Sequence, residues 1–447
     1  MSSLSIADLL SAYPTLTFGL EEHLVSRPFA SLLQQRWDEF SEYLEGNIAH
    51  RLTEDSVLDC VRNNLAYTIK AYRHLVSVRA FLDLPLIDKG DLLARAPDFL
   101  ACCSAGATWS KTTSGTTGPP VTIVYSPHFY FTQLYLSVRK IVASLGDSVC
   151  WRERSVWCVH ITDTQSNGER VVSSPTPEGE LSVQILVNSL APETFAAAAS
   201  FLDHIRPVVI TSRPELLVIM AQNIACRRYF QTAPPRYVVS SGSALDDTRR
   251  ILLREALNAR LVNAYGLSEF GLVAWECQRG SLHVDETTVL AEVLSANNTP
   301  AEEGAVGELV ISGIDNDAMP LIRYRTGDRA QLGQSSCTCG IPGRTLTSIV
   351  GRYVPCFQFS SGPPFSPTIF NELLKLFPLE EYQITQTDTD EVAVTVEPRS
   401  DSHSADLLTS IREYIIDRVP PYVKTKVHRG HLSATGKYQR YRVGFHD

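Results

Sequence analysis

The chain has no long basic run, no apolar segment of bilayer length, no internal repeats and no low-complexity tracts among its 447 residues. Its 40 Lys and Arg against 49 Asp and Glu give a formal charge of −9, which argues against nucleic acid or an anionic membrane as a partner. The first residues lack the basic region and apolar core of a signal peptide. The ten cysteines lack the dense spacing of a disulfide-stapled secreted domain. We therefore expect a folded cytoplasmic protein of two or three structural units.

A loop rich in glycine and hydroxyl side chains stands out at residues 112–120, T-T-S-G-T-T-G-P-P. Glycines allow successive backbone N–H groups to converge on an anion, and Ser and Thr hydroxyls add further donors. The loop does not follow the Walker pattern, because Pro119 and no lysine comes after Gly118. The residues alone leave two interpretations open, a triphosphate site and an ordinary surface loop.

Further motifs follow this loop in order. They are Tyr265-Gly266-Leu267-Ser268-Glu269, Tyr324-Arg325-Thr326-Gly327-Asp328, Gly351-Arg352 and Gly436-Lys437, and L-P-L-I-D-K-G-D-L at residues 84–92 precedes the loop. In this order and spacing the chain resembles the adenylate-forming superfamily of acyl-CoA synthetases, peptide-synthetase adenylation domains and luciferases. Within that superfamily it is similar to the phenylacetate–CoA ligase branch. The resemblance covers about residues 60–445, and the motifs are specific jointly rather than singly.

The hydrophobic pattern predicts an α/β fold. Apolar runs from residue 105 to about 350 alternate between strand-like and helix-like lengths, residues 1–100 read as mostly helical, and residues 283–330 read as β-rich. A small α+β pattern follows near the C-terminus. We expect a large α/β domain over residues 1–352, with mixed sheets, packed helices, a β-rich subdomain and a helical shoulder over 1–100. A hinge would join it to a mobile α+β domain over residues 353–447.

Two local predictions concern helix boundaries. Apolar residues at every third or fourth position predict one helix over Val57–Leu75. The sequence Ser212-Arg213-Pro214-Glu215 is typical of a capping box that opens a helix over Glu215–Ala225.

The resemblance implies an ATP site. The residues it assigns to the β- and γ-phosphates are Thr113, Ser114, Gly115, Thr116, Thr117 and Gly118, and those it assigns to adenine are Tyr265 with Gly266, and Gly242, Ser243 and Ala244. It assigns the ribose hydroxyls to Asp328 with support from Arg352, a phosphate to the Ser268 hydroxyl, and Mg²⁺ to Glu269. Without the motifs, Tyr265 would read as a strand-end aromatic and Asp328 as a turn residue after glycine.

The resemblance also implies the catalytic pair, Lys437 and Glu269. A lysine at this place in the family enters with the C-terminal domain and bridges the substrate carboxylate and the α-phosphate, whereas a lone lysine is ordinarily a solvated surface group. His160, at a buried strand, is a candidate contact to the substrate carboxylate or a structural histidine. Tyr265 and Gly266 are expected to line the acid site as well.

Cys277, His283, Cys337 and Cys339 match a tetrahedral Cys₃His zinc site in residue type. Their C-x₅-H and C-x-C spacings are looser than the usual C-x₂-C, and the alternative is a set of reduced, unligated thiols. Similar residues in the resembling family hold a structural zinc.

Two departures from the family pattern leave the acyl acceptor open. Pro119 stands where the family usually has a phosphate-binding lysine, and Tyr353-Val354 stands where it has an acidic pair at the hinge. We predict an ATP- and Mg²⁺-dependent enzyme that adenylates a small carboxylic acid, with an aromatic acid as one candidate, and transfers the acyl group to a thiol such as CoA. The alternatives are an amide synthetase with an amine acceptor, a loader of an acyl carrier protein, and a silent nucleotide-binding homologue. The sequence leaves the oligomeric state open, with a homodimer as one candidate.

Overall fold

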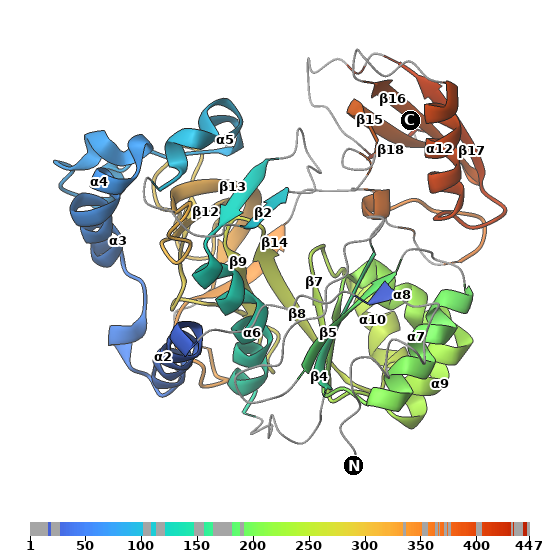
Figure 1. The fold of residues 1–447 in the computed structure, drawn as a ribbon, viewed down its shortest axis with the longest axis horizontal. Helices are drawn as coiled ribbons and strands as arrows, with labels where there is room; N and C mark the ends of the chain where they lie inside the picture. Colours follow the sequence, from blue (N-terminus) through green and yellow to red (C-terminus); the bar gives the residue numbers. More distant parts are fainter. Residues whose placement is uncertain are drawn as a thin grey trace.

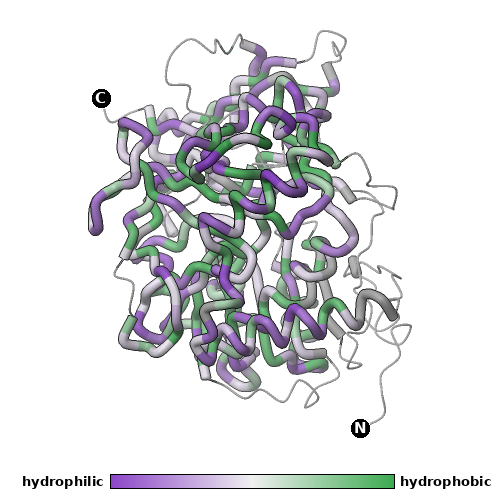
Figure 2. Tube along the Cα trace, turned by 90° about the vertical axis from the view of Figure 1, so that its left-hand side faces the viewer, coloured by the Kyte–Doolittle hydropathy of each residue, from purple (hydrophilic) through white to green (hydrophobic). Residues whose placement is uncertain are grey.

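The structure is a computed structural model of the chain. It describes residues 17–18, 27–101, 109–112, 121–146, 156–163, 181–187, 192–333, 337–350, 356–362, 365, 367–370, 373, 377–398, 405–430, 432 and 441–444. None of the helices in these ranges combines the length and the apolar character that a bilayer crossing requires. Figure 2 shows short hydrophobic segments alternating with hydrophilic ones along the described trace.

A twelve-stranded sheet organises the larger part of the structure (Figure 1). In spatial order its strands are β1 (Thr17–Phe18), β5 (Leu181–Val187), β4 (Val156–Asp163), β6 (Val209–Ser212), β7 (Tyr237–Ser241), β8 (Arg260–Leu267), β9 (Gly271–Glu276), β10 (Leu282–Val284), β14 (Thr345–Val350), β13 (Leu321–Leu332), β12 (Val306–Gly313) and β11 (Val289–Leu294). Strands β5, β4, β6, β7 and β8 pair in parallel, whereas β9 onward pair antiparallel. The sheet therefore joins a parallel half to the antiparallel, β-rich half expected from residues 283–330.

Helices cover both faces of the parallel half. On one face lie α7 (Pro192–Ile205), α8 (Pro214–Gln222), α9 (Ile224–Thr232) and α10 (Asp247–Ala256), and on the other lie α2 (Arg27–Leu44) and α6 (Pro127–Ser144). Successive strand residues point to opposite faces, so Val238 packs in the first core while Tyr237 and Val239 pack in the second. This helix–sheet–helix arrangement confirms the α/β prediction for the large part of the chain.

The helical shoulder is more broken than predicted. It contains α3 (Glu54–Cys60), a π-helical turn (Val61–Leu65), α4 (Ala66–Thr68), a 3₁₀ helix (Lys70–Leu75) and α5 (Lys89–Arg95). The prediction of one helix over Val57–Leu75 is wrong, because buried Ile69 is extended (φ −118°, ψ 122°) and forms a β-bridge with Ala101. A tertiary pairing of this kind overrides the local helical pattern.

The predicted capping box before α8 is also wrong. The N-cap residue is Arg213, without a side-chain cap, and the Ser212 hydroxyl instead donates to the carbonyl of Ile161 over 2.6 Å. The helix ends at Gln222, because Asn223 accepts from the N–H groups at the start of α9. Glu215 does not form a capping box with Ser212, and its carboxylate contacts Ser243 and Arg249.

A second, four-stranded sheet lies near the C-terminus, at the upper right of Figure 1. Its order is β17 (Lys424–Arg429), β16 (Glu391–Pro398), β15 (Leu379–Asp388) and β18 (Tyr441–Val443), and α12 (Ala405–Ile416) packs on it. Its core includes buried Phe357, Tyr382 and Ile411. This agrees with the α+β pattern predicted there. The proposed boundary at residues 352–353 falls outside the described residues, so the division into 1–352 and 353–447 stays a prediction.

Candidate active site

Tyr265 and Asp328 are in direct contact although they come from distant strands. The Tyr265 hydroxyl donates to Asp328 Oδ2 over 2.7 Å. Burial, and after it the Asp328 charge and this hydrogen bond, raise the pKa of Tyr265 well above its ordinary value. The phenol therefore keeps its proton near neutral pH and holds one oxygen of the Asp328 carboxylate.

The backbone before Asp328 is anchored on strand β12. The Thr326 hydroxyl donates to the carbonyl of Leu309 over 2.8 Å, and the Asp328 N–H donates to Thr326 Oγ1 over 3.1 Å. Gly327 between them has φ +76°, in the left-handed region that favours glycine. The threonine hydroxyl and the glycine therefore support this local geometry.

Glu269 lies in the β8–β9 connection, directly after Ser268. Its Oε1 accepts from the hydroxyl of buried Tyr324 over 3.0 Å, and Tyr324 is the first residue of the Y-R-T-G-D motif. The two motifs are therefore joined twice, by Tyr265–Asp328 and by Tyr324–Glu269.

The two strands that flank residues 113–120 in the sequence are linked to the same place. Strands β2 (Trp109–Thr112) and β3 (Thr122–Tyr125) pair antiparallel, with Thr112 opposite Thr122. At the end of β3 the Tyr125 hydroxyl donates to the carbonyl of Ser268 over 2.7 Å. Burial, with the Glu269 charge, raises the pKa of Tyr125, so this donor also stays protonated.

Residues 242–244 follow strand β7, beside β8. Ser241 pairs with Ala264 in the parallel register, so the loop after β7 and Tyr265 lie at neighbouring carboxyl ends, where open α/β sheets bind ligands. Gly242 has φ +87°, and a Cβ there would lie 3.3 Å from Arg213 Cγ. The Ser243 hydroxyl donates to both carboxylate oxygens of Glu215 at 2.8 Å each.

Several predicted site residues lie outside the described residues. They are Thr113, Ser114, Gly115, Thr116, Thr117, Gly118, Arg352 and Lys437, and the departures at Pro119, Tyr353 and Val354 lie outside as well. Their assigned roles remain predictions. The described site residues lie at and after the carboxyl ends of β7 and β8 and within β13, which the Tyr265–Asp328 hydrogen bond connects to β8. They are Gly242, Ser243, Ala244, Tyr265, Gly266, Ser268, Glu269 and Asp328.

His160 lies on β4, which β6 separates from β7. Its Nε2 is 3.7 Å from Cys158 Sγ, and burial lowers the pKa of His160 to about 4. The imidazole is therefore neutral near pH 7. It is equipped to hydrogen-bond a carboxylate but not to neutralise it, so its substrate role remains a prediction.

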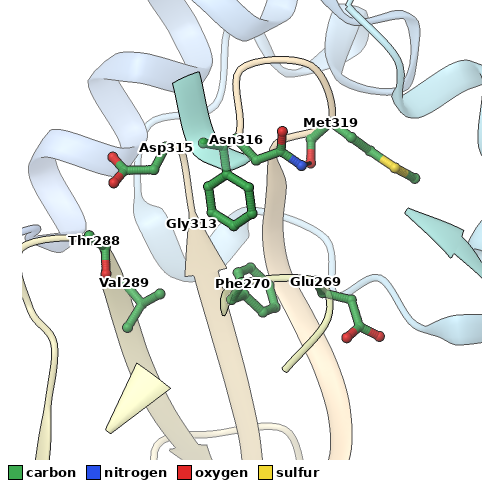
Figure 3. Close-up of a pocket in the computed structure, with 9 residues that line it drawn as sticks. Glu269, Phe270, Thr288, Val289, Gly313, Asp315, Asn316 and Met319 are labelled. Atoms are coloured by element: carbon green, nitrogen blue, oxygen red, sulfur yellow. Dashed lines mark hydrogen bonds between the residues drawn. The ribbon is translucent and has the colours of Figure 1, made fainter. Parts of the chain in front are cut away.

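A small pocket adjoins Glu269 (Figure 3). Its lining includes Phe129, Phe270, Asp315 and Asn316, and it has room for about one water molecule. Glu269 and Asp315 point away from each other in Figure 3. Burial raises the pKa of Asp315 to about 6 despite its ion pair with Arg36 at 3.1 Å. The pocket is too small, as it stands, to hold an organic acid.

The four zinc candidates come together in the described structure. Their ligand atoms all lie within 4.8 Å of one another, with Cys277 Sγ 3.9 Å from Cys337 Sγ and Cys339 Sγ 3.2 Å from His283 Nε2. Tetrahedral bonds of about 2.0–2.3 Å imply separations of about 3.4–3.8 Å between ligand atoms, close to these values.

Other features of this cluster also suit a metal. The N–H groups of Arg279 and Ile341 donate to the sulfurs of Cys277 and Cys339 at 3.3 and 3.4 Å, and such donors stabilise thiolates that bind a metal. Burial lowers the pKa of His283, which favours the neutral imidazole that a metal binds. The donor set therefore fits zinc.

Sequence reasoning missed the residues that hold the site together. Tyr125 and Tyr324 lie at the edges of recognised motifs, but nothing local shows that their hydroxyls reach Ser268 and Glu269. Glu215 was assigned to a helix start, where a glutamate is common. Arg249, which contacts Glu215, lies on a charged amphipathic helix and carries no local signal.

The fold matches that of a solved CoA ligase. A crystal structure of 2-hydroxyisobutyryl-CoA ligase with 2-HIB-AMP and CoA in the thioesterification state matches 87% of this chain and 89% of that one, with a TM-score of 0.59 and 18% identity. An open conformation of the same ligase gives a TM-score of 0.53 at 17% identity, over 87% of this chain and 91% of that one. At this identity the likeness shows the fold alone.

Curated relatives match shorter stretches. A phenylacetate-coenzyme A ligase of Thermus thermophilus is 32% identical over 157 residues, which cover 34% of this chain and 35% of that protein. One of Pseudomonas putida is 28% identical over 207 residues, covering 44% and 46%. The chain thus matches between a third and a half of the length of these relatives, and no protein-family model matches it. The fold and these matches together confirm the resemblance to adenylate-forming ligases of the phenylacetate–CoA ligase-like branch.

Proposed function

We propose that this protein is an AMP-forming acid ligase. It joins a small carboxylic acid to the α-phosphate of ATP, releases pyrophosphate, and transfers the acyl group to the thiol of CoA. The double link between the two motifs, Tyr265 to Asp328 and Tyr324 to Glu269, is the observation that carries the proposal. It joins the residues assigned to adenine, ribose and Mg²⁺ into one site.

In this proposal each described residue performs a separate task. Tyr265 offers its ring to adenine while its hydroxyl holds Asp328, whose carboxylate accepts from the ribose hydroxyls. Residues 242–244 let adenine approach the backbone closely. Glu269 would hold Mg²⁺, which would supply the charge neutralisation that two approaching anions need.

The residues outside the described ranges complete the proposed site. Thr113–Gly118 hold the β- and γ-phosphates, Arg352 supports the ribose, and Lys437 bridges the carboxylate and the α-phosphate. Tyr265 and Gly266 border the acid, with His160 as a neutral hydrogen-bond partner.

We also propose a structural zinc held by Cys277, His283, Cys337 and Cys339. The cluster joins the turn after β9, strand β10 and the segment before β14, so a metal there would fix the antiparallel half of the sheet. We propose no catalytic role for this zinc site.

A carrier-protein thiol or an amine is the second candidate for the acceptor. Tyr353-Val354 stands where the resembling family has an acidic hinge pair, and that pair belongs to the thioester-forming half-reaction. This departure bears on the acceptor and not on adenylation.

Mass spectrometry of reaction mixtures tests the proposal. The protein is incubated with Mg·ATP and each of a panel of aryl and short aliphatic acids, with and without CoA. We expect acyl-AMP with one class of acid, acyl-CoA when CoA is added, and neither product with Lys437→Ala, although that variant should still bind ATP. Acyl-AMP without acyl-CoA would favour the second acceptor. Binding of ATP without any acyl-AMP would favour a silent nucleotide-binding homologue.

A further inference from the structure

A buried group of charged and polar side chains supports the loop after β7. Glu215 in the first turn of α8 and Arg249 in α10 are only 6% and 7% exposed, and the Arg249 Nη1 lies 3.5 Å from Glu215 Oε1. Burial alone would raise the pKa of Glu215, but Arg213, Arg249, its own N–H and the Ser243 hydroxyl together hold it below the ordinary value. The carboxylate is therefore charged and fully engaged.

Arg249 contacts this loop at several points. Its Nη1 donates to the carbonyl of Ala244 over 3.0 Å, and its Nε lies 3.3 Å from Asp246 Oδ2. Asp246 in turn caps α10 by accepting from the Arg249 N–H over 2.8 Å. The guanidinium therefore fixes the backbone of residues 244–246, directly beside Ser243.

The remaining Arg249 nitrogen reaches a different part of the chain. Nη2 donates to Cys356 Sγ over 3.3 Å. Cys356 is half-buried and immediately precedes Phe357, which is fully buried in the core of the four-stranded sheet. Ile219 of α8 packs against the same core. The Arg249–Cys356 contact therefore lies where the helices of the twelve-stranded sheet meet the four-stranded sheet.

We propose that Arg249 is a positioning residue that couples the nucleotide loop after β7 to the chain segment at Cys356, and so to the four-stranded sheet. The proposal rests on the proposed function, since it takes residues 242–244 as the adenine loop. Arg249 is suited to this task because its planar guanidinium has several N–H donors in a fixed arrangement. These nitrogens contact Ala244, Glu215, Asp246 and Cys356 simultaneously. Movement of residues 244–246 on nucleotide binding would displace the guanidinium and release or tighten Cys356.

The reactivity of Cys356 measures this coupling directly. The intact protein is alkylated with iodoacetamide, with and without Mg·ATP, and the modification of Cys356 is quantified from its peptide by mass spectrometry. Three proteins are compared: wild type, Arg249→Lys, and Arg254→Lys, an exposed arginine on the same helix. Lysine keeps the positive charge but lacks the planar guanidinium that contacts several partners simultaneously.

We expect Mg·ATP to change the alkylation rate of Cys356 at least threefold in wild type and in Arg254→Lys. In Arg249→Lys the rate should be at least threefold faster without nucleotide, and Mg·ATP should change it little. Calorimetric ATP binding is measured on the same samples. ATP binding with an unchanged Cys356 rate in wild type, or an equal ATP effect in Arg249→Lys, would overturn the coupling alone. No ATP binding by any of the three proteins would overturn the proposed function and the coupling together.

Discussion

The Tyr265 hydroxyl donates to Asp328 Oδ2 across a sequence separation of 63 residues. The strands that carry them, β8 and β13, are separated in the sheet by β9, β10 and β14. The curvature of the sheet therefore brings together two residues that strand order alone would keep apart. This bond links the two residues that we propose for adenine and ribose.

The substitution Tyr265→Phe removes the hydroxyl and keeps the aromatic ring, so it tests the hydroxyl alone. The variant retains a stacking surface but removes the Tyr265 hydrogen bond to Asp328, and hydrogen bonds to charged groups contribute about 1.5–3 kcal/mol. We expect the KM for ATP to rise about tenfold with kcat changed less than threefold, measured by pyrophosphate release. Tyr265→Ala, which also lacks the ring, should raise the KM for ATP further. Equal KM values for Tyr265→Phe and wild type would show that the hydroxyl does not support the ribose site.

Glu269→Gln tests the assigned magnesium ligand. The substitution keeps the shape and the capacity to accept from Tyr324 but removes the charge that attracts a hard cation. Adenylation should fall about a hundredfold or more, with partial recovery at high Mg²⁺ concentration. Glu303→Gln, in an exposed turn, is the matched control and should behave as wild type. Full activity of Glu269→Gln at ordinary Mg²⁺ would remove the assignment.

Metal analysis tests the Cys₃His cluster. We expect about one zinc per chain in purified wild type and in Cys60→Ser, whose half-buried thiol lies outside the cluster. In Cys339→Ser the zinc content should fall well below one, and the thermal unfolding midpoint should fall by roughly 5 °C, because a ligand that binds only the folded state stabilises it. Wild-type protein with no zinc and a midpoint insensitive to chelators would exclude a structural metal.

The raised pKa of Asp315 predicts how the free energy of unfolding depends on pH. Burial raises its pKa from an ordinary 3.8 to about 6, so the folded state binds this proton more tightly than the unfolded chain does. The carboxyl therefore destabilises the fold increasingly as the pH rises through this range. Relative to wild type, Asp315→Asn should gain about 1 kcal/mol of unfolding free energy between pH 5 and pH 8. Asp317→Asn, at an exposed position two residues away, is the matched control, and an equal gain in both variants would contradict the shift.

Much of the fold was predictable because its signals are local. Short apolar runs bounded by turns marked the parallel strands, and the motif strings marked the strand ends where ligands bind. The failures came where a distant partner outweighed the local pattern. Ile69 leaves its helix to pair with Ala101, and Ser212 bonds to Ile161 instead of capping α8.

The site was predictable in its residue types but not in its connections. Motifs identified Tyr265, Glu269 and Asp328, yet the hydroxyls of Tyr125 and Tyr324 that fix this region act across 143 and 55 residues. Arg249 and Glu215 are 34 residues apart and resemble ordinary surface charges in sequence. Only the packing of α8 against α10 makes them a buried pair.

Acid-dependent exchange of pyrophosphate into ATP is the most direct measurement of the central claim, because it reports reversible adenylation without requiring any acceptor. With a panel of aryl and short aliphatic acids, we predict exchange that depends on Mg²⁺, is restricted to one class of acid, and is abolished in Lys437→Ala. Wild-type protein that binds ATP but shows no exchange with any acid of the panel would contradict the assignment of this protein as an acid ligase.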